Sequence, residues 1–156
     1  MTQEEYALAV QQLRTRLYRT AFLYLGSEAL ALDAVDEAVY KGLRGLHKLR
    51  QPEFFTTWLT RILLNECSRE KKRQRRLHTL EDFEGTDGGL DALPLKEAIR
   101  RLSPELSQVV ILRYFSGYTL AETARILEIP PGTAATRQRR ALALLRLELC
   151  EKEGDA

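Results

Sequence analysis

The sequence predicts an all-α protein made of two small helical domains that a flexible acidic linker joins. Apolar residues recur at helical spacing along most of the 156 residues, and no segment shows the alternation of a strand. Glycine and proline are sparse, with 9 and 5 residues, and they fall between the periodic segments. The periodicity stops in residues 77–94, so the domains are expected at residues 1–76 and 95–156.

Three helices are expected in the first domain. The first spans about residues 4–25, and Gly26-Ser27 fits a helix end followed by an N-cap. The second spans about residues 28–47, and a long third helix begins near Glu53 and runs into a basic segment. The residues expected to face the core lie at helical spacing: Val10, Leu13, Leu17, Ala21 and Tyr24 in the first helix, Leu32, Val35, Val39, Leu43 and Leu46 in the second, and Phe55, Trp58, Leu59 and Ile62 in the third.

The linker, residues 77–94, holds three glycines and five acids. Its 18 residues can span at most ~60 Å, which corresponds to ~17 base pairs of duplex DNA. The second domain resumes at Leu95, and Ser103-Pro104 fits the start of a further helix that ends at Ser116-Gly117.

A capping box at residues 119–122 opens a short helix to about residue 128. A tight turn at residues 129–132 follows, and the last helix is expected at about residues 131–149. The core-facing residues expected on it are Ala134, Ala141, Leu142 and Leu145.

Composition excludes several classes of protein. The charged fraction of 29% and the hydrophobic fraction of 44% are those of a soluble globular protein. No signal peptide begins the chain and no apolar run approaches the ~18 residues of a membrane span, so a cytoplasmic location is expected. Cys67 and Cys150, with His47 and His78, suggest no disulfide framework and no metal site.

Charge is strongly segregated, although the net charge is only +2. Residues 61–76 carry seven basic and two acidic side chains, and residues 137–146 carry four arginines and no acid. Residues 81–91, between them, hold five acids and no base. Two basic segments predict two surfaces for a polyanion, most simply nucleic acid, although a solvated helix face explains either segment alone equally well.

The strongest motif is a helix-turn-helix at residues 119–146. A capped short helix, a tight turn and an arginine-bearing helix are typical of a protein that places one helix in the major groove. Thr136, Arg139 and Arg140 share a face of the last helix, and arginine can donate two hydrogen bonds to a guanine edge. Backbone amides at residues 131–133 offer a phosphate site. The alternative is a helical hairpin with a solvated basic face.

A second polar face lies on the third helix, opposite its apolar face. Its members stand at helical spacing: Arg61, Asn65, Arg69 and Lys72. Asparagine offers a donor and an acceptor to a base edge, and the cations can hold phosphates. Phe54, Phe55 and Trp58 at the helix start can stack on an unpaired base. Core filling is the competing interpretation for Phe55 and Trp58.

An acidic face on the second helix consists of Asp33, Asp36 and Glu37. Paired carboxylates can serve acid–base catalysis, but no histidine, lysine or metal ligand accompanies these in the sequence. No catalytic residue is therefore assigned, and an enzyme is not expected. A docking face for a basic protein is the preferred interpretation, with a solvated face as the alternative.

Seven short segments, in this order and spacing, resemble two conserved regions of the sigma-70 family of bacterial RNA polymerase factors. LYRTAF at residue 17, DAVDEA at residue 33 and WLTRILLN at residue 58 are similar to the second region. LSPEL at residue 102, LRYF at residue 112, GYTLAETA at residue 117 and GTAATRQRRA at residue 132 are similar to the fourth. Because only these two regions are present, the chain resembles the extracytoplasmic-function (ECF) subfamily.

The resemblance implies a transcription initiation factor whose partners are RNA polymerase core and promoter DNA, with no cofactor and no small-molecule substrate. Region 2 would dock Asp33, Asp36 and Glu37 on the polymerase clamp, and region 4 would contact the flap. The implied −10 contacts, which melt and read that element, are Arg61, Asn65, Arg69, Lys72, Phe54 and Trp58. The implied −35 contacts are Thr119, Gly132, Thr133, Thr136, Arg137, Arg139 and Arg140.

The resemblance also implies an anti-sigma factor, commonly membrane-bound in this family. An autonomous helix-turn-helix regulator is the alternative, but it leaves the acidic face and the Asn65 face without a role. The departures from the family pattern are Ala135 in place of a common Lys or Arg, Gln138 in place of an apolar residue, Pro130 in place of a capping Ser, Arg69 in place of a common Asp, and Gly42 within the second helix.

Overall fold

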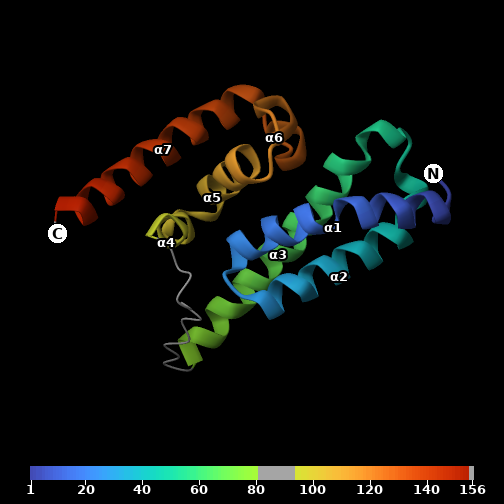
Figure 1. Ribbon diagram of the computed structural model, residues 1–156, viewed down its shortest axis with the longest axis horizontal. Helices are drawn as coiled ribbons and strands as arrows, with labels where there is room; N and C mark the ends of the chain where they lie inside the picture. The colour runs from blue at the N-terminus through green and yellow to red at the C-terminus, as the bar shows by residue number, and fades with distance from the viewer. Residues whose placement is uncertain (81–93, 155–156) are drawn as a thin grey trace. The chain divides into compact units, whose positions relative to one another are not determined.

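Every regular element that the computed structural model describes is helical, which confirms the all-α prediction (Figure 1). The structure describes the backbone of residues 1–80 and 94–154 and the side chains of residues 1–77 and 94–146. The chain divides into two compact units, Met1–Gly85 and Thr86–Ala156. Most of the predicted linker, residues 81–93, lies outside the described residues.

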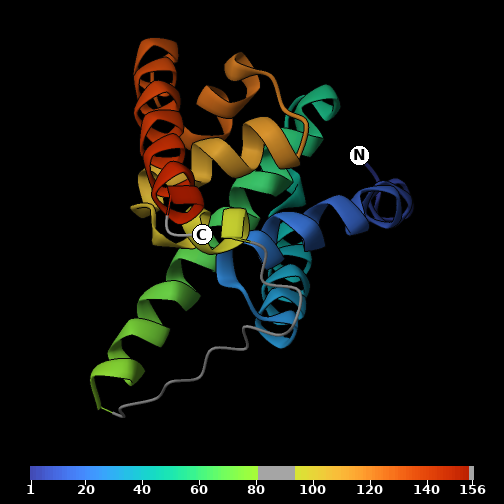
Figure 2. The same ribbon diagram turned by 60° about the vertical axis from the view of Figure 1, so that its left-hand side comes forward.

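Unit 1 contains three long helices that lie side by side (Figures 1 and 2). They are α1 (Gln3–Leu25), α2 (Glu28–Arg44) and α3 (Phe55–Leu80), and the short 3₁₀ turns η1 (Leu46–Lys48) and η2 (Pro52–Phe54) connect α2 to α3. Figure 2 shows the last turns of α3 projecting beyond α1 and α2. The third helix thus extends four residues past the predicted domain end at residue 76.

Local chemistry sets the ends of α1 and the start of α2. Thr2 caps α1 by accepting a hydrogen bond from the Glu5 amide at 3.1 Å. Gly26 ends α1 in the left-handed conformation, with φ 73°, and its amide donates to the Phe22 carbonyl at 2.7 Å. Ser27 then caps α2 through the Leu30 amide. The predicted helix end and N-cap at Gly26-Ser27 are confirmed.

The inner face of α2 differs from the prediction. Leu32 and Leu43 are 45% and 42% exposed, and α2 ends at Arg44 instead of continuing to residue 47. Small residues face the core instead: Ala31, Ala34, Ala38 and Gly42, together with Val35. A Cβ at Gly42 would lie 2.5 Å from Tyr6 Oη and 2.9 Å from Leu59 Cδ1, so α2 packs too closely for larger side chains there.

The buried face of α3 is wider than the prediction because α3 packs against both α1 and α2. Phe55 and Leu59 are buried as expected, whereas Trp58 and Ile62 are only half-buried. The prediction missed several buried residues farther along the helix, Leu63, Leu64 and Cys67. At the other end of the bundle, Tyr6 is buried and donates a hydrogen bond to the Val39 carbonyl at 2.5 Å.

In the residues that the structure describes, unit 2 is built from four short helical elements and one long helix. They are α4 (Pro94–Arg101), α5 (Pro104–Val110), the π-helical turn η3 (Ile111–Phe115), α6 (Leu120–Leu127) and α7 (Pro131–Gly154). The predicted capping box is confirmed, because Thr119 Oγ1 accepts from the Glu122 amide at 3.1 Å while the Glu122 carboxylate accepts from the Thr119 amide at 2.9 Å. Ser103 stands at the N-cap of α5, as predicted, but its side chain makes no capping hydrogen bond.

The last helix packs through one narrow stripe. Ala134, Ala141 and Leu145 are buried as predicted, but Leu142 is 39% exposed, so its assignment to the core was wrong. The helix continues to Gly154, five residues beyond the predicted end. Within residues 131–146 only Ala134, Ala141 and Leu145 are buried, so most of this part of α7 stays open to solvent.

Candidate nucleic-acid interface

The polar face of α3 lies on the side of the helix that does not enter the core. Arg61, Asn65, Arg69 and Lys72 follow one another at steps of three or four residues, so they share one face. Asn65, Arg69 and Lys72 are exposed, and Arg61 is half-buried. This arrangement offers one amide between cations, which suits a base contact flanked by phosphate contacts.

Aromatic side chains surround the start of α3. Phe55 is buried, and its ring packs edge-on against Tyr6 with centroids 5.7 Å apart, so Phe55 fills the core. Trp58 is half-buried and lies 6.2 Å from the Phe55 ring. Phe54, in η2, is also half-buried. Trp58 and Phe54 therefore keep part of their surface available next to the Asn65 face.

The carboxylates of α3 face α2 and are held by basic side chains. Glu66 is 9% exposed, forms an ion pair with Lys41 of α2, and lies 3.9 Å from Arg69 Nη1. Glu70 accepts a hydrogen bond from Gln74 at 2.9 Å and lies 3.7 Å from Arg73 Nη1. The acids of α3 thus lie toward α2, and Arg69 of the outward polar face reaches Glu66 in an ion pair.

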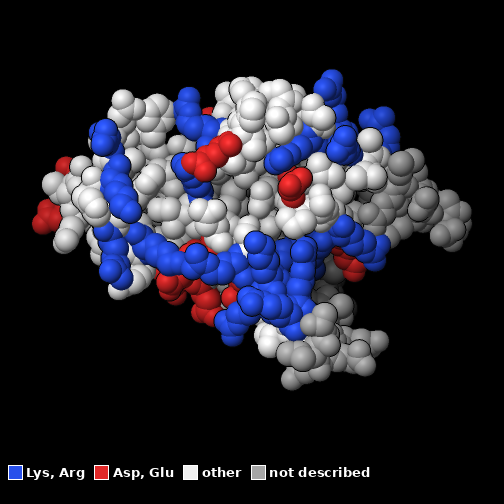
Figure 3. Space-filling model, turned by 180° about the vertical axis from the view of Figure 1, so that it is seen from behind, with Lys and Arg blue, Asp and Glu red and all other residues white. Residues whose placement is uncertain are grey.

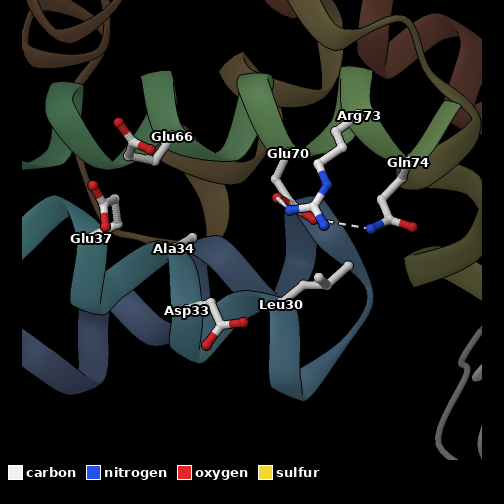
Figure 4. A pocket seen from close by; sticks show the side chains of 8 residues that line it. All are labelled: Leu30, Asp33, Ala34, Glu37, Glu66, Glu70, Arg73 and Gln74. Atoms are coloured by element: carbon white, nitrogen blue, oxygen red, sulfur yellow. Dashed lines mark hydrogen bonds and ion pairs between the residues drawn. The ribbon is translucent and has the colours of Figure 1, made fainter. Parts of the chain in front are cut away.

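A pocket of about 340 Å³ lies between α2 and α3, and Figure 4 shows its lining. The lining residues are Leu30, Asp33, Ala34, Glu37, Glu66, Glu70, Arg73 and Gln74. Two of the three predicted docking carboxylates, Asp33 and Glu37, therefore border the same hollow as the acids of α3. Arg73 and Lys41 pair with Glu70 and Glu66, so the unpaired Asp33 and Glu37 leave the opening with a net negative charge that favours a cationic side chain.

The three predicted docking carboxylates are not equivalent. Asp36 accepts a hydrogen bond from Arg14 of α1 at 3.0 Å. Asp33 and Glu37 are exposed, and neither has a hydrogen bond or ion pair with any residue that the structure describes. Sequence reasoning missed Arg14, which stands 22 positions before its partner and carries no local signal of the pairing.

The last helix presents Thr136, Arg139 and Arg140 to solvent on one face. Thr136 Oγ1 donates to the Gly132 carbonyl at 3.0 Å, and Arg139 Nη2 lies 3.5 Å from Thr136 Oγ1. Arg137 turns toward α5 instead, with its Nη2 3.9 Å from Glu105 Oε2 and its side chain only 25% exposed. The pairing of Arg137 was another feature that the sequence did not indicate.

The start of α7 is open. Gly132 is exposed, and no heavy atom lies within 4 Å of the position that a Cβ would take. Thr133 is half-buried, and the hydroxyl of Thr119 is already used by the capping box. The Gly132 and Thr133 amides stand in the first turn of α7, where backbone amides lack partners within the helix and can meet an anion.

Neither a membrane helix nor a metal cluster is found in the described part of the chain. No described helix is both long and apolar enough to cross a bilayer. Among the same residues, no group of three His, Cys, Asp or Glu side chains is arranged to hold a metal ion.

Two family signatures match the two units. Residues 9–77 match sigma-70 region 2, and residues 92–145 match sigma-70 region 4. The chain belongs to the sigma-70 family. Among its relatives, RNA polymerase sigma factor SigV of Bacillus subtilis is 30% identical over 142 residues, which is 87% of this chain and 86% of SigV. The ECF sigma factor SigM of Mycobacterium tuberculosis is 30% identical over 137 residues, 83% of this chain and 69% of SigM.

Solved sigma factors share the fold of this ECF sigma factor. Sigma factor RpoE of Bartonella quintana, solved with the anti-sigma factor NepR, has a TM-score of 0.78 at 22% identity, covering 94% of this chain and 97% of RpoE. CnrH, solved with the cytosolic domain of CnrY, has a TM-score of 0.75 at 21% identity, covering 96% of this chain and 90% of CnrH. Region 2 of this sigma factor therefore includes α2 and the polar face of α3, and region 4 includes the helix-turn-helix.

Proposed function

We propose that this sigma factor directs core RNA polymerase to promoters by binding a −10 element through α3 and a −35 element through α7. The observation that carries the proposal is the pair of exposed polar faces, one in each matched region. The α3 face combines Asn65 with cations, and the α7 face combines Thr136 with Arg139 and Arg140. Both faces have the chemistry that DNA recognition needs.

At the −10 element, Asn65 contacts an unpaired base and the flanking cations hold phosphates. Arg61, Arg69 and Lys72 stand within three turns of Asn65, so one helix supplies both kinds of contact. The partly exposed rings of Phe54 and Trp58 at the start of α3 provide a surface on which an unpaired base stacks.

At the −35 element, α7 enters the major groove and α6 braces it against the backbone. Arg139 and Arg140 contact base edges, and the hydrogen bond of Thr136 to Gly132 holds the first turn for contact beside them. The sugar-phosphate backbone of the −35 element is contacted by the remaining residues, Arg137, Thr119, Gly132 and Thr133. The ion pair with Glu105 limits the reach of Arg137, so its phosphate contact depends on release from that carboxylate.

Core polymerase docks on α2 through Asp33 and Glu37. Support comes from the two open carboxylates beside the pocket between α2 and α3, which suit basic side chains of a partner. Asp36 contributes less because Arg14 already compensates its charge. The sigma factor also has an anti-sigma factor as its regulator. Support comes from RpoE, which shares the fold and was solved with the anti-sigma factor NepR.

Run-off transcription with core polymerase tests the proposal. Purified sigma factor and core should together initiate at discrete sites that share −10 and −35 sequences, whereas core alone should not. Failure to recruit core, with sequence-specific DNA binding retained, would instead identify an autonomous helix-turn-helix regulator.

A further inference from the structure

Thr136 stands in the second turn of α7, and its hydroxyl takes part in two hydrogen bonds. The hydroxyl donates to the Gly132 carbonyl, one turn earlier, with 3.0 Å between the two oxygens. The same oxygen accepts from Arg139 Nη2, one turn later, at 3.5 Å. Both Thr136 and Arg139 are exposed. One hydroxyl therefore links the first turn of α7 to an arginine that the proposed function assigns to base contact.

The first of these bonds commits the hydrogen of the Thr136 hydroxyl. A threonine hydroxyl has one hydrogen to donate and two lone pairs that accept. Because the hydrogen lies toward the Gly132 carbonyl, the oxygen presents only its lone pairs to other groups. Lone pairs attract a cation, and the guanidinium of Arg139 is the group that reaches them.

Arg139 and Arg140 share the outward face of α7 but differ in their neighbours. Among the residues that the structure describes, Thr136 is the only partner of Arg139, and Arg140 makes no hydrogen bond or ion pair. The charge of Arg139 is thus not compensated by a carboxylate, whereas Arg137 is paired with Glu105. In Figure 3, Lys and Arg side chains project from the surface along α7. The Thr136 hydroxyl therefore orients Arg139 and leaves its positive charge available to DNA.

We propose that Thr136 is a positioning residue, which holds the guanidinium of Arg139 in the orientation that reads a guanine in the −35 element. This inference rests on the proposed function, in which Arg139 contacts a base edge. Arg139 Nη2 uses one of its two hydrogens on Thr136 and keeps the other, and both hydrogens of Nη1 remain. Two donors are therefore left for the O6 and N7 acceptors of a guanine.

Orientation matters for arginine because its side chain is long and loses much rotational freedom when it is fixed. A hydrogen bond that exists before DNA binds has already removed part of this freedom, so less is lost on binding. The correct base then meets donors that are already oriented toward it. Arg140 has no such restraint, so Thr136 should affect sequence preference at the base pair that Arg139 reads and not at the one that Arg140 reads.

Selection of −35 sequences by the holoenzyme tests this role. Arg139→Ala and Arg140→Ala first identify the base pair that each arginine reads. Thr136→Val then removes the hydroxyl and keeps the size and branching of the side chain. It should lower the preference for guanine at the Arg139 position about threefold, within the roughly two- to tenfold effect of one hydrogen bond. The preference at the Arg140 position should not change.

Two further variants control for the loss of a hydroxyl as such. Thr136→Ser keeps the hydroxyl and should restore the preference for guanine. Thr15→Val makes the same change as Thr136→Val at an exposed position of α1, and it should leave every preference unchanged.

The double variant Thr136→Val/Arg139→Ala separates positioning from direct contact. If Thr136 acts through Arg139, its hydroxyl has no further effect once Arg139 is removed, so the double variant should have the preference of Arg139→Ala alone. Additive losses, or a loss at a different base pair in Thr136→Val, would show that Thr136 itself contacts a base and would overturn the inference. An unchanged preference in Arg139→Ala or in Thr136→Val overturns it as well. A wild-type holoenzyme that selects no −35 sequence overturns the proposed function instead, and that result is seen before any variant is compared.

Discussion

At the residue scale, the three predicted docking carboxylates of α2 differ in their neighbours. Arg14 donates to Asp36 at 3.0 Å, while Asp33 and Glu37 border the pocket between α2 and α3. An exposed ion pair of this kind contributes only ~0–1 kcal/mol to stability. Its larger effect is to reduce the charge that Asp36 presents to a partner.

We therefore expect Asp33→Asn/Glu37→Gln to weaken binding to core polymerase at least about tenfold, which corresponds to ~1.4 kcal/mol. Asp36→Asn should have a smaller effect, because the carboxylate that it removes is already paired. Reversing all three charges should abolish binding and leave the fold intact. Titration of labelled sigma factor with core measures the affinities, and circular dichroism checks the fold. Equal losses from Asp36→Asn and from the double variant would contradict the assignment.

The free energy of unfolding of region 2 should depend on pH above about 9, because the thiol of Cys67 and the hydroxyl of Tyr6 are buried. Burial raises the pKa of the Cys67 thiol from 9.0 to about 12, with the charge of Glu66 adding to the effect. Burial likewise raises the pKa of Tyr6 from 10.0 to about 12. The folded protein keeps both protons where the unfolded chain releases them. The stabilisation is therefore complete below pH 9 and is lost as pH rises toward 12.

Between pH 9 and pH 10 the thiol dominates this loss. The free energy of unfolding of region 2 should fall with a slope that approaches ~1.4 kcal/mol per pH unit. Cys67→Ala should be less stable at neutral pH, since it leaves a cavity, but its stability should change less across this interval. Urea unfolding at pH 8, 9 and 10 provides the measurement. Parallel pH profiles for the two proteins would show that Cys67 does not carry the dependence.

At the element scale, close contact between helices explains both the errors and the successes of prediction. The ends of α1 and α2 were predictable because Gly26 and Ser27 act on their own backbone. The inner face of α2 was not, since the spacing of Leu32 and Leu43 is as regular as that of the alanines. At Gly42 the small residue follows from the close approach of Tyr6 and Leu59, which the sequence does not show.

The same reasoning applies to the candidate site. The polar faces of α3 and α7 follow from helical periodicity, so the sequence alone placed Asn65 and Arg139 on outward faces. The pairing of Asp36 with Arg14 and of Arg137 with Glu105 joins different helices. Such pairs depend on how the helices pack, and no local pattern predicts them.

Gly42→Ala should test how closely α2 packs. Alanine gains ~0.5–1 kcal/mol over glycine inside a helix, but its Cβ would press on Tyr6 and Leu59. Overpacking of this kind costs ~1–3 kcal/mol, so the net effect should be destabilising. Gly132→Ala is the matched control, because the space around its Cβ is open and the substitution should be neutral or stabilising. Thermal unfolding measures both, and equal responses would contradict the close contact.

Arg139 and Arg140 should differ from Arg137 in how their substitution changes the DNA sequences selected for binding. Arg139→Ala or Arg140→Ala should cost ~1–3 kcal/mol and relax the preference at one base pair, because these side chains face outward together. Arg137→Ala should weaken all sequences alike and lower the salt slope by about one. Glu105→Gln releases Arg137 and should raise affinity without changing base preference. Unchanged preference in both Arg139→Ala and Arg140→Ala would mean that another face of α7 reads the DNA.

At the scale of the whole molecule, the proposed function assigns the two units to separate parts of a promoter, so their functions should separate experimentally. Asn65→Ala alters region 2 alone and leaves the α7 face intact. It should reduce permanganate reactivity of thymines at the −10 element while the footprint at −35 persists. A template that is already open at −10 should restore transcription. If this template fails to restore activity, Asn65 acts at another step.

The segregation of charge on α3 has a consequence for the approach to DNA. The acids of α3 lie on the side that faces α2, and most of its cations lie on the opposite side. This separation of charge gives the helix an electric dipole moment perpendicular to its axis, although the net charge of the chain is only +2. The field of a polyanion exerts a torque on such a moment and turns the cationic side toward the nucleic acid before contact. Because ions screen this field beyond ~8 Å at physiological salt, the torque acts only in the last steps of the encounter.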